Sequence, residues 1–420
     1  MGGIGKRRRI GVRLAAVALA GASVVAVAPT AGAVDLAGTE AERRARVEGQ
    51  QELRELVEHG GMTAALAEIR IGRSTWRGAV GVAELGSGRP ARADGRFRIG
   101  SVTKTFVATV VLQLAGERRL RLDDPVERYL PGVVPNGAAI TVRQLLNHTS
   151  GLYNFTEDDR FLVNDEAELE DYAYGRWRYQ DHRARQLVAV AAEHAPYFPP
   201  GQGWKYSNTN YVLAGMIIQK VTGRSWQRET ERRIVEPLGL HDTLFPTSQT
   251  GLGGPSAHAY LAMPAGPADI TRFNPSVVDS AGNGISTTAD LNRFHAALFG
   301  GKLLRPAQMA DLTTTVPTGT PGGSYGLGVL RIDLGPSCEP AWGHDGGLPG
   351  WSTLLLGSRD GKRQFALSHN PFVGTDDSAS GPAIGSLIVK TLCDEQRPAA
   401  RGTAPWTPPS TGPDLLVTPR

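Results

Sequence analysis

The chain has 420 residues, of which 40% are hydrophobic and 20% charged, a composition that excludes a low-complexity protein. We expect a globular protein with a large core, organised as one large domain or two closely packed ones. The formal net charge of +4 depends on residues 1–33, which contain five basic and no acidic residues, so the rest of the chain carries −1. The charge therefore does not support a nucleic-acid partner.

Residues 1–33 have the pattern of a secretory signal peptide. A basic segment at 6–13 precedes an apolar run at 14–28, and the small residues 31–33 suit cleavage. The alternative is an uncleaved membrane anchor, but the apolar run is shorter than the ~20 residues that a membrane-spanning helix needs. We therefore expect a secreted, extracellular protein without a stable membrane span, whose mature chain begins near Val34.

The first part of the mature chain combines a helix pattern with strand patterns. Residues 35–59 are charged and carry apolar residues at helical spacing, whereas 79–83 and 96–99 indicate strands separated by Gly-rich turns. We expect two or three antiparallel strands before residue 101. Neither a βαβ rhythm nor a Gly-x-Gly-x-x-Gly fingerprint is present, which argues against a nucleotide-binding fold.

The next segment, Ser101-Val-Thr-Lys104, separates a strand pattern from a long apolar stretch. Ser101 is therefore expected to start a helix, with Lys104 one turn later on the same face. Unpaired N–H groups and the helix dipole would stabilise an oxyanion there, and a buried lysine can accept or relay the hydroxyl proton. This is the Ser-x-x-Lys nucleophile pattern. Alone it is a weak signal, because a Ser cap and a solvent-facing Lys produce the same pattern by chance.

Residues 122–198 are expected to be mainly helical. A short helix at 140–146, with Thr141 as its cap, leads into the polar segment around His148. His148 is a candidate catalytic base, but its polar neighbours suit a hydrogen-bonded loop equally well, and we favour the structural role. Residues 153–198 carry no recognisable chemistry and are expected to belong to a helical subdomain over a cleft.

A second polar segment, Tyr206-Ser-Asn208, precedes an apolar helix at 212–221. On an extended segment the side chains of Tyr206 and Asn208 point the same way, so both can face the nucleophile. The alternative is a packed tyrosine and an asparagine helix cap.

The C-terminal third is expected to consist of a helix followed by strands. A Ser/Thr-capped helix begins near residue 285 and reaches Phe299. Beyond Glu395 the Pro/Thr/Gly-rich tail has too few apolar residues to fold, and we expect it to be flexible or processed. Extended patterns occur at residues 324–332, 342–347, 352–356 and 364–368.

The chain has two cysteines, Cys338 and Cys393. Export would place them in an oxidising compartment, and no histidine or second cysteine pair lies near them at metal-ligand spacing. We therefore expect a disulfide and no zinc site. The alternative is two free, buried thiols.

Three stretches stand in the order and spacing of the motifs of the penicillin-recognising serine hydrolases: Ser101-Val-Thr-Lys104, Tyr206-Ser-Asn208 and His344-Asp-Gly346. Their flanks resemble the class C β-lactamase-related group of this family. Within it the chain is most similar to secreted actinomycete D-alanyl-D-alanine carboxypeptidases, which carry His rather than Lys in the third motif. The resemblance extends over residues 55–395. The flanks that carry it are residues 145–152, 200–211 and 237–240.

The resemblance implies an α+β fold in which an antiparallel sheet, built from both chain ends, is flanked by helices. An all-helical subdomain would be inserted at roughly residues 115–285, with the active site between it and the sheet. The serine hydrolase domain would span residues 34–395 and leave residues 396–420 as the tail.

The resemblance also implies acyl transfer without a metal or cofactor. Ser101 would attack a carbonyl, while Lys104 and Tyr206 share the proton transfer, and either of them can be the base. The backbone N–H groups of Ser101 and Gly347 would hold the oxyanion.

For substrate binding, the resemblance implies Asn208, which would hold the substrate amide, and His344 and Gly346 of the third motif. Asp345 stands where close relatives often carry a threonine whose hydroxyl helps to bind a substrate carboxylate. If Asp345 faced the cleft it would repel a carboxylate, which Arg331 on a neighbouring strand could offset. Strand alternation instead places Asp345 opposite His344 and Gly346, in a structural role.

The leading hypothesis is a secreted, monomeric serine D-Ala-D-Ala carboxypeptidase that acts on peptidoglycan stem peptides and is acylated by β-lactams. The alternative is an esterase or a class C-type β-lactamase that uses the same Ser-Lys-Tyr site on small acyl substrates. A catalytically silent penicillin-binding or cell-wall-binding module is disfavoured by the intact motifs.

Overall fold

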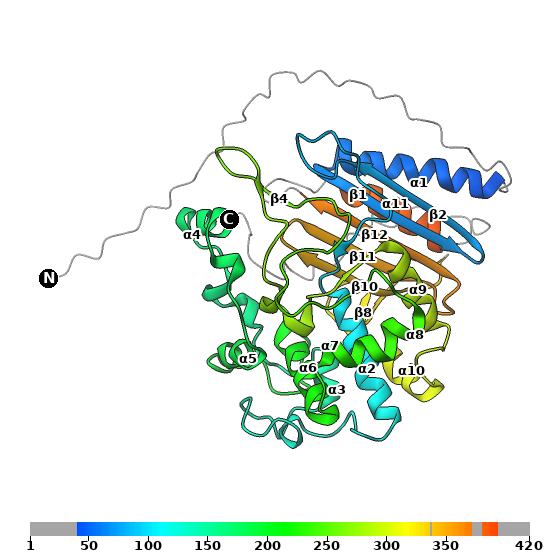
Figure 1. The fold of residues 1–420 in the computed structure, drawn as a ribbon. Coiled ribbons are helices and arrows are strands. Elements are labelled where there is room, and N and C mark those ends of the chain that lie inside the picture. The colour runs from blue at the N-terminus through cyan, green and yellow to red at the C-terminus, as the bar shows by residue number, and fades with distance from the viewer. Residues whose placement is uncertain (1–39, 337, 372–379, 394–420) are drawn as a thin grey trace. The chain divides into compact units, whose positions relative to one another are not determined.

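The computed structural model describes residues 40–336, 338–371 and 380–393. The expected signal peptide, residues 1–33, and the expected tail, residues 396–420, lie outside these ranges. Within them, an antiparallel sheet carries helices on both faces, and a mainly helical part packs beside it (Figure 1). This is the expected α+β architecture.

The main sheet has eight strands in the order β2-β1-β12-β11-β10-β9-β8-β7, and all pairings are antiparallel. Its first and last strands in the chain, β1 and β12, are neighbours, so the sheet is built from distant parts of the sequence. Two short ladders pair β3 with β6 and β4 with β5. The pair β4–β5 lies within residues 115–285, where the sequence predicts helices alone. The strands are β1 (Met62–Ile71), β2 (Ser74–Gly81), β3 (Phe97–Arg98), β4 (Tyr260–Leu261), β5 (Ala268–Asp269), β6 (Ile285–Ser286), β7 (Val316–Pro317), β8 (Gly323–Tyr325), β9 (Leu330–Ile332), β10 (Ala341–Leu348), β11 (Trp351–Gly357) and β12 (Arg363–Pro371).

Helices α1 and α11 pack on one face of the sheet, and α2 and α9 pack on the other (Figure 1). In the helical part, α6 contacts α2, α3, α5 and α7. No helix in the described ranges is long and apolar enough to cross a membrane. The helices are α1 (Glu40–Glu58), α2 (Val102–Gly116), α3 (Val142–Leu146), α4 (Glu166–Tyr174), α5 (Ala184–Ala192), α6 (Asn208–Thr222), α7 (Trp226–Thr230), α8 (Glu236–Leu238), α9 (Thr288–Phe299), α10 (Pro306–Thr313) and α11 (Ser380–Leu392), with short turns η1 (Val126–Arg128), η2 (Phe155–Glu157), η3 (Asp159–Phe161), η4 (Trp177–Tyr179), η5 (Glu231–Val235), η6 (Pro275–Val277) and η7 (Asp279–Ala281).

Helix α2 lies between the sheet and the helical part, and 12 of its 15 residues are buried. It is apolar on nearly every side, the pattern of a helix inside a protein. The Phe106 ring stacks on Phe294 of α9 with 3.7 Å between centroids and meets Phe245 edge-on at 5.3 Å. These contacts hold α2, and with it the position of Ser101.

Several local predictions are confirmed. Thr141 caps α3 with a capping box, and the Thr287 hydroxyl accepts a backbone N–H at the start of α9. This helix begins at Thr288 rather than near residue 285, because Ile285 and Ser286 form β6. The side chains of Cys338 and Cys393 form a disulfide. This bond joins the segment before β10 to the end of α11.

The chain reverses within residues 324–332, where the sequence predicts a single strand, and forms the β8–β9 hairpin. In the turn, Gly328 has a φ of +77°, which glycine adopts without strain. A Cβ at Gly328 would lie 2.6 Å from the Ala108 Cβ and 2.9 Å from the Tyr211 hydroxyl. The hairpin therefore packs directly on α2 and α6.

Candidate active site

Ser101 lies immediately before α2, whose first residue is Val102. Its backbone is helical (φ −63°, ψ −11°), but its side chain makes no capping hydrogen bond with the helix. The hydroxyl instead contacts the side chains of Lys104 and Tyr206. The preceding residue, Gly100, has a φ of +49° and forms the turn between β3 and α2.

Strand β10 passes directly against this turn. A Cβ at Gly100 would lie 2.8 Å from the Gly347 nitrogen, and a Cβ at Gly346 would lie 2.9 Å from the Ser101 nitrogen. Both positions therefore require glycine, because any side chain would push the strand away from the helix start. The backbone nitrogens of Ser101 and Gly347, the pair expected to stabilise an oxyanion, thus both lie at this contact between the two elements.

The amine of Lys104 contacts the nucleophile. Its Nζ lies 2.5 Å from Ser101 Oγ, 2.7 Å from Asn208 Oδ1 and 2.7 Å from the carbonyl oxygen of Ala281. The amide and carbonyl oxygens can only accept hydrogen bonds. In its neutral form the amine would donate its two N–H groups to them and turn its lone pair toward the Ser101 hydroxyl, as a general base requires.

Tyr206 contacts the same hydroxyl from a second direction. Its phenol oxygen is 2.7 Å from Ser101 Oγ, and the Lys104 Nζ lies 4.7 Å from the centre of its ring. Tyr206 and Lys104 are thus both placed to exchange a proton with Ser101. In one arrangement Lys104 accepts the proton, and in the other an ionised Tyr206 does so.

His148 supports Tyr206 and does not touch the nucleophile. It is fully buried at a φ of +63°, and its ring packs on Tyr206 with 4.3 Å between centroids. Its Nδ1 accepts hydrogen bonds from the Ser207 N–H and from the Asn210 amide, both at 3.2 Å. Burial, together with the Lys104 charge, lowers the pKa of His148 well below its usual value, so the imidazole is neutral. These contacts agree with the structural role favoured from the sequence.

Asn208, the first residue of α6, holds Lys104 in place. Its Oδ1 accepts from the Lys104 amine, and its Nδ2 donates to Thr156 Oγ1 at 3.2 Å. The Asn208 backbone N–H donates to Asn154 Oδ1 at 2.9 Å. The support from Asn154 and Thr156 in and beside η2 has no motif in the sequence, since such polar residues are common in loops.

His344 is fully buried behind Tyr206, with 6.4 Å between the ring centroids. Its Nδ1 lies 2.6 Å from the backbone oxygen of Asp345, which can only accept, so Nδ1 carries the proton. In the neutral ring Nε2 then accepts from the Tyr325 hydroxyl at 2.7 Å. Burial raises the pKa of Tyr325 well above its usual value and keeps it a donor. The sequence does not predict this role, because the hairpin that carries Tyr325 is itself unexpected.

The third-motif strand places Asp345 beside His344. The Asp345 carboxylate lies 3.4 Å from the His344 Nδ1, and 17% of its side-chain surface is exposed. Along β10 the buried His344 and Gly346 alternate with the partly exposed Asp345 and Gly347, as strand alternation predicts. Arg331 lies opposite Trp342 in the β9–β10 pairing, three positions and roughly 10 Å along β10 from Asp345. The Arg331 backbone is therefore not directly opposite Asp345.

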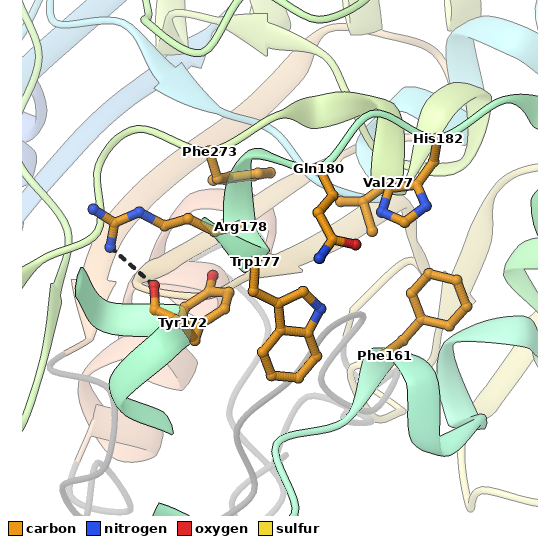
Figure 2. Close-up of a pocket in the computed structure, with 8 residues that line it drawn as sticks. All are labelled: Phe161, Tyr172, Trp177, Arg178, Gln180, His182, Phe273 and Val277. Atoms are coloured by element: carbon orange, nitrogen blue, oxygen red, sulfur yellow. Dashed lines mark hydrogen bonds between the residues drawn. The ribbon is translucent and has the colours of Figure 1, made fainter. Parts of the chain in front are cut away.

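Cavities of the helical part lie apart from this cluster. One is lined by residues that include Phe161, Trp177, His182 and Phe273 (Figure 2). None of its lining residues belongs to the Ser101 cluster. Within the described ranges, no group of three or more His, Cys, Asp or Glu side chains is arranged to hold a metal ion.

Comparison with known proteins agrees with the fold. The Beta-lactamase family model matches residues 47–387. The esterase EstB of Burkholderia gladioli is 31% identical over 340 residues, which cover 73% of this chain and 83% of EstB. Penicillin-binding protein 4 of Amycolatopsis lactamdurans is 29% identical over 297 residues, 66% of this chain and 72% of that protein. A solved D-stereospecific amidohydrolase from Streptomyces sp. has a TM-score of 0.72 at 40% identity and covers 83% of this chain and 99% of its own.

The sheet, the helical part and the Ser-Lys-Tyr cluster between them define a serine hydrolase. The chain belongs to the β-lactamase family, which includes penicillin-binding relatives. The family resemblance stated from the three motifs is thereby confirmed.

Proposed function

We propose that the protein hydrolyses amide bonds whose acyl side is a D-amino acid residue. The observation that carries this proposal is the hydrogen-bonded contact of Ser101 Oγ with both Lys104 Nζ and Tyr206 OH, beside the glycines of β10. Such a cluster serves acyl transfer to a serine. The D-configuration is supported by the similarity to the Streptomyces D-stereospecific amidohydrolase.

The reaction follows from the positions of the hydrogen-bonding groups. Ser101 Oγ attacks the substrate carbonyl carbon as its proton passes to Lys104 or to an ionised Tyr206. The oxyanion that forms is held by the N–H groups of Ser101 and Gly347, a contribution of about 3–4 kcal/mol per donor in other acyl-transfer enzymes. The C–N bond then breaks, the leaving amine takes up the proton, and water releases the acyl group from Ser101.

Asp345 favours a neutral or cationic substrate end over a free carboxylate. A like charge at 4 Å costs about 1 kcal/mol in water and several in a partly desolvated cleft. Arg331 is not directly opposite Asp345 in the β9–β10 pairing, and Gly347 offers no hydroxyl for a carboxylate. A D-Ala-D-Ala carboxypeptidase is therefore the second candidate, supported by its three motifs and by the penicillin-binding relatives.

A substrate panel tests this proposal. D- and L-phenylalanine amide, an acyl-D-Ala-D-Ala peptide, a short-chain aryl ester and a cephalosporin are incubated with the full chain, and adducts are followed by intact mass. We expect kcat/KM for the D-amide to exceed that for the L-amide by about tenfold or more, ~1.4 kcal/mol. Preferred release of D-Ala would favour the carboxypeptidase, turnover of the ester alone an esterase, and turnover of the cephalosporin alone a β-lactamase. Absence of both turnover and adduct would contradict all of these.

We further propose that the protein is exported. This is supported by the signal-peptide pattern of residues 1–33 and by the Cys338–Cys393 disulfide, a bond typical of oxidising compartments. Intact mass of the mature protein from the culture medium should place its N-terminus near Val34, and thiol titration under denaturing, non-reducing conditions should find no free thiol. Retention of the full-length chain inside the cell would contradict export.

A further inference from the structure

The carbonyl of Ala281, which accepts from Lys104, belongs to a tight turn that begins at Asp279. Asp279 has a φ of +38°, an unusual conformation for a residue other than glycine, although Asp and Asn tolerate it better than most. Its own carbonyl accepts hydrogen bonds from the N–H groups of Gly282 at 3.1 Å and Asn283 at 3.0 Å. The bend at Asp279 therefore sets the direction in which Ala281 presents its oxygen.

The side chain of Asp279 fixes this turn to α7. Its Oδ1 accepts a hydrogen bond from Trp226 Nε1 at 2.8 Å. Trp226 is 4% exposed and packs edge-on against Phe245 with 5.4 Å between centroids. The next residue, Ser280, donates from Oγ to the Tyr211 carbonyl of α6 at 2.9 Å. The Asp279 side chain thus ties the turn to α7, and the Ser280 side chain ties it to α6.

The chain that enters the turn is also anchored. Phe273 and Val277 line the small cavity of the helical part (Figure 2). The Asn274 N–H donates to the Arg178 carbonyl at 2.7 Å, and the His182 N–H donates to Ser276 Oγ at 2.9 Å. With this entry segment fixed, the conformation at Asp279 decides where the Ala281 oxygen lies.

We propose that Asp279 is a positioning residue for Lys104. Its bend and its hydrogen bond to Trp226 hold the Ala281 carbonyl where it takes one N–H of the Lys104 amine. Because the Asn208 side chain accepts the second N–H of the amine, the amine lone pair is directed at Ser101. The proposal rests on the acyl-enzyme chemistry proposed above and adds a part of its machinery that neither touches substrate nor belongs to the three motifs.

The expected effect is on rate rather than on substrate binding. If the turn relaxes, the Ala281 oxygen moves. The lone pair of the Lys104 amine is then no longer directed at Ser101. A misplacement of about 1 Å at a reacting group can lower a rate by about 100-fold. The affinity for substrate depends on other groups and should remain.

Four variants separate the two features of Asp279. Asp279→Ala removes the carboxylate and disfavours the bend, Asp279→Gly removes only the carboxylate, Asp279→Asn keeps both, and Trp226→Phe removes only the donor. Acylation of the full chain by an aryl ester and by a β-lactam is followed in single turnover, normalised to active sites. We expect Asp279→Ala to lower the acylation rate constant about 30- to 100-fold, Asp279→Gly and Trp226→Phe about 3- to 10-fold, and Asp279→Asn to retain at least about a third of the rate.

A matched control is Asp290→Asn. Asp290 is also a carboxylate that accepts hydrogen bonds, from the Asp242 N–H and the Thr243 hydroxyl, both at 2.9 Å, but it lies in α9 and does not touch the turn. This control should change the melting temperature without changing the acylation rate constant. In Asp279→Ala the acid limb of the pH profile should also shift by at least about half a pH unit, which a loss of folded protein alone would not produce.

Equal acylation rate constants in wild type, Asp279→Ala and Trp226→Phe would overturn the positioning role. If Asp279→Ala does not fold, the acylation rate constants of wild type, Asp279→Gly and Trp226→Phe are compared instead, and equal values would overturn the positioning role. Failure of the wild type to react with any probe would overturn the proposed function and this role with it. Normal acylation of the wild type with unaffected variants would overturn only the role.

Discussion

At the scale of single residues, Ser101 contributes chemistry and little packing. Its hydroxyl contacts two side chains of the reaction centre, Lys104 and Tyr206, in the bonds described above. We predict that Ser101→Ala abolishes hydrolysis of every substrate and formation of a β-lactam adduct. The melting temperature should change by less than about 3 °C, because one net hydrogen bond contributes about 1 kcal/mol. Intact mass and thermal melting check this, and an adduct on the variant would refute the assignment of the nucleophile.

Asp345 is predicted to determine which substrate ends are accepted. Removing its charge should make the site more favourable to a carboxylate, because the repulsion in a partly desolvated cleft is lost. We expect Asp345→Thr to raise kcat/KM for acyl-D-Ala-D-Ala relative to D-phenylalanine amide by about tenfold, ~1.4 kcal/mol.

Asp345→Asn serves as the control for this prediction, since it removes the charge without adding a hydroxyl to the site. We expect Asp345→Asn to give part of the same gain in kcat/KM for acyl-D-Ala-D-Ala relative to D-phenylalanine amide. A ratio that stays within about threefold of wild type in both variants would show that Asp345 has only a structural role.

At the scale of secondary-structure elements, the active site depends on the contact between the start of α2 and strand β10. We predict that Gly100→Ala lowers acylation at least about 100-fold, because its Cβ would lie 2.8 Å from the Gly347 nitrogen and push β10 away. The matched control is Gly72→Ala, at a φ of +60° with no atom within 4 Å of the added Cβ.

Both glycine variants introduce a left-handed alanine, which costs about 1 kcal/mol, so both should lose some stability. Only Gly100→Ala should lose acylation beyond its loss of folded protein. Equal acylation by the two variants would argue against β10 as the second wall of the oxyanion site.

At the scale of the whole molecule, buried histidines make stability depend on pH. Burial lowers the pKa of His295 and of His369 to about 4. In the unfolded chain each has a pKa near 6.5, so below that pH the unfolded state binds more protons. The free energy of unfolding therefore falls as the pH decreases from about 6.5 to about 4, by on the order of 3 kcal/mol per histidine. Asp279, whose pKa burial raises to about 6, opposes this trend because the folded state binds its proton first.

Denaturant unfolding at pH 7.5 and pH 5 measures this dependence. We expect the wild type to lose on the order of 2 kcal/mol per buried histidine between these values. His295→Gln is the informative variant, because a glutamine N–H can still donate to the Trp342 carbonyl, which His295 Nε2 approaches to 2.9 Å. Between pH 7.5 and pH 5, the free energy of unfolding should therefore fall less in His295→Gln than in the wild type. The difference should equal the contribution of one histidine, about 2 kcal/mol. If His295→Gln and the wild type lose the same free energy of unfolding between the two pH values, His295 is not a source of the pH dependence.

The sequence by itself determined the features that depend on neighbouring residues. The helix start at Ser101, with Lys104 one turn later, follows from an apolar stretch behind a short polar segment. The caps at Thr141 and Thr287 follow from hydroxyl residues before helix patterns. The disulfide between Cys338 and Cys393 follows from there being only two cysteines in a chain that the pattern of residues 1–33 predicts to be exported. Each of these is a local signal or a matter of counting.

Only the tertiary structure decided the features that depend on residues far apart in the chain. Strand β1 has no alternating pattern because both its faces are buried, and it pairs with β12 at the other end of the chain. The reversal at Gly328 depends on close packing against α2 and α6. The position of Arg331 depends on the register between β9 and β10, which no local pattern specifies. The Ala281 oxygen that holds Lys104 is a backbone carbonyl, a group present at every residue. It has this role because the fold places it within hydrogen-bond distance of the Lys104 amine.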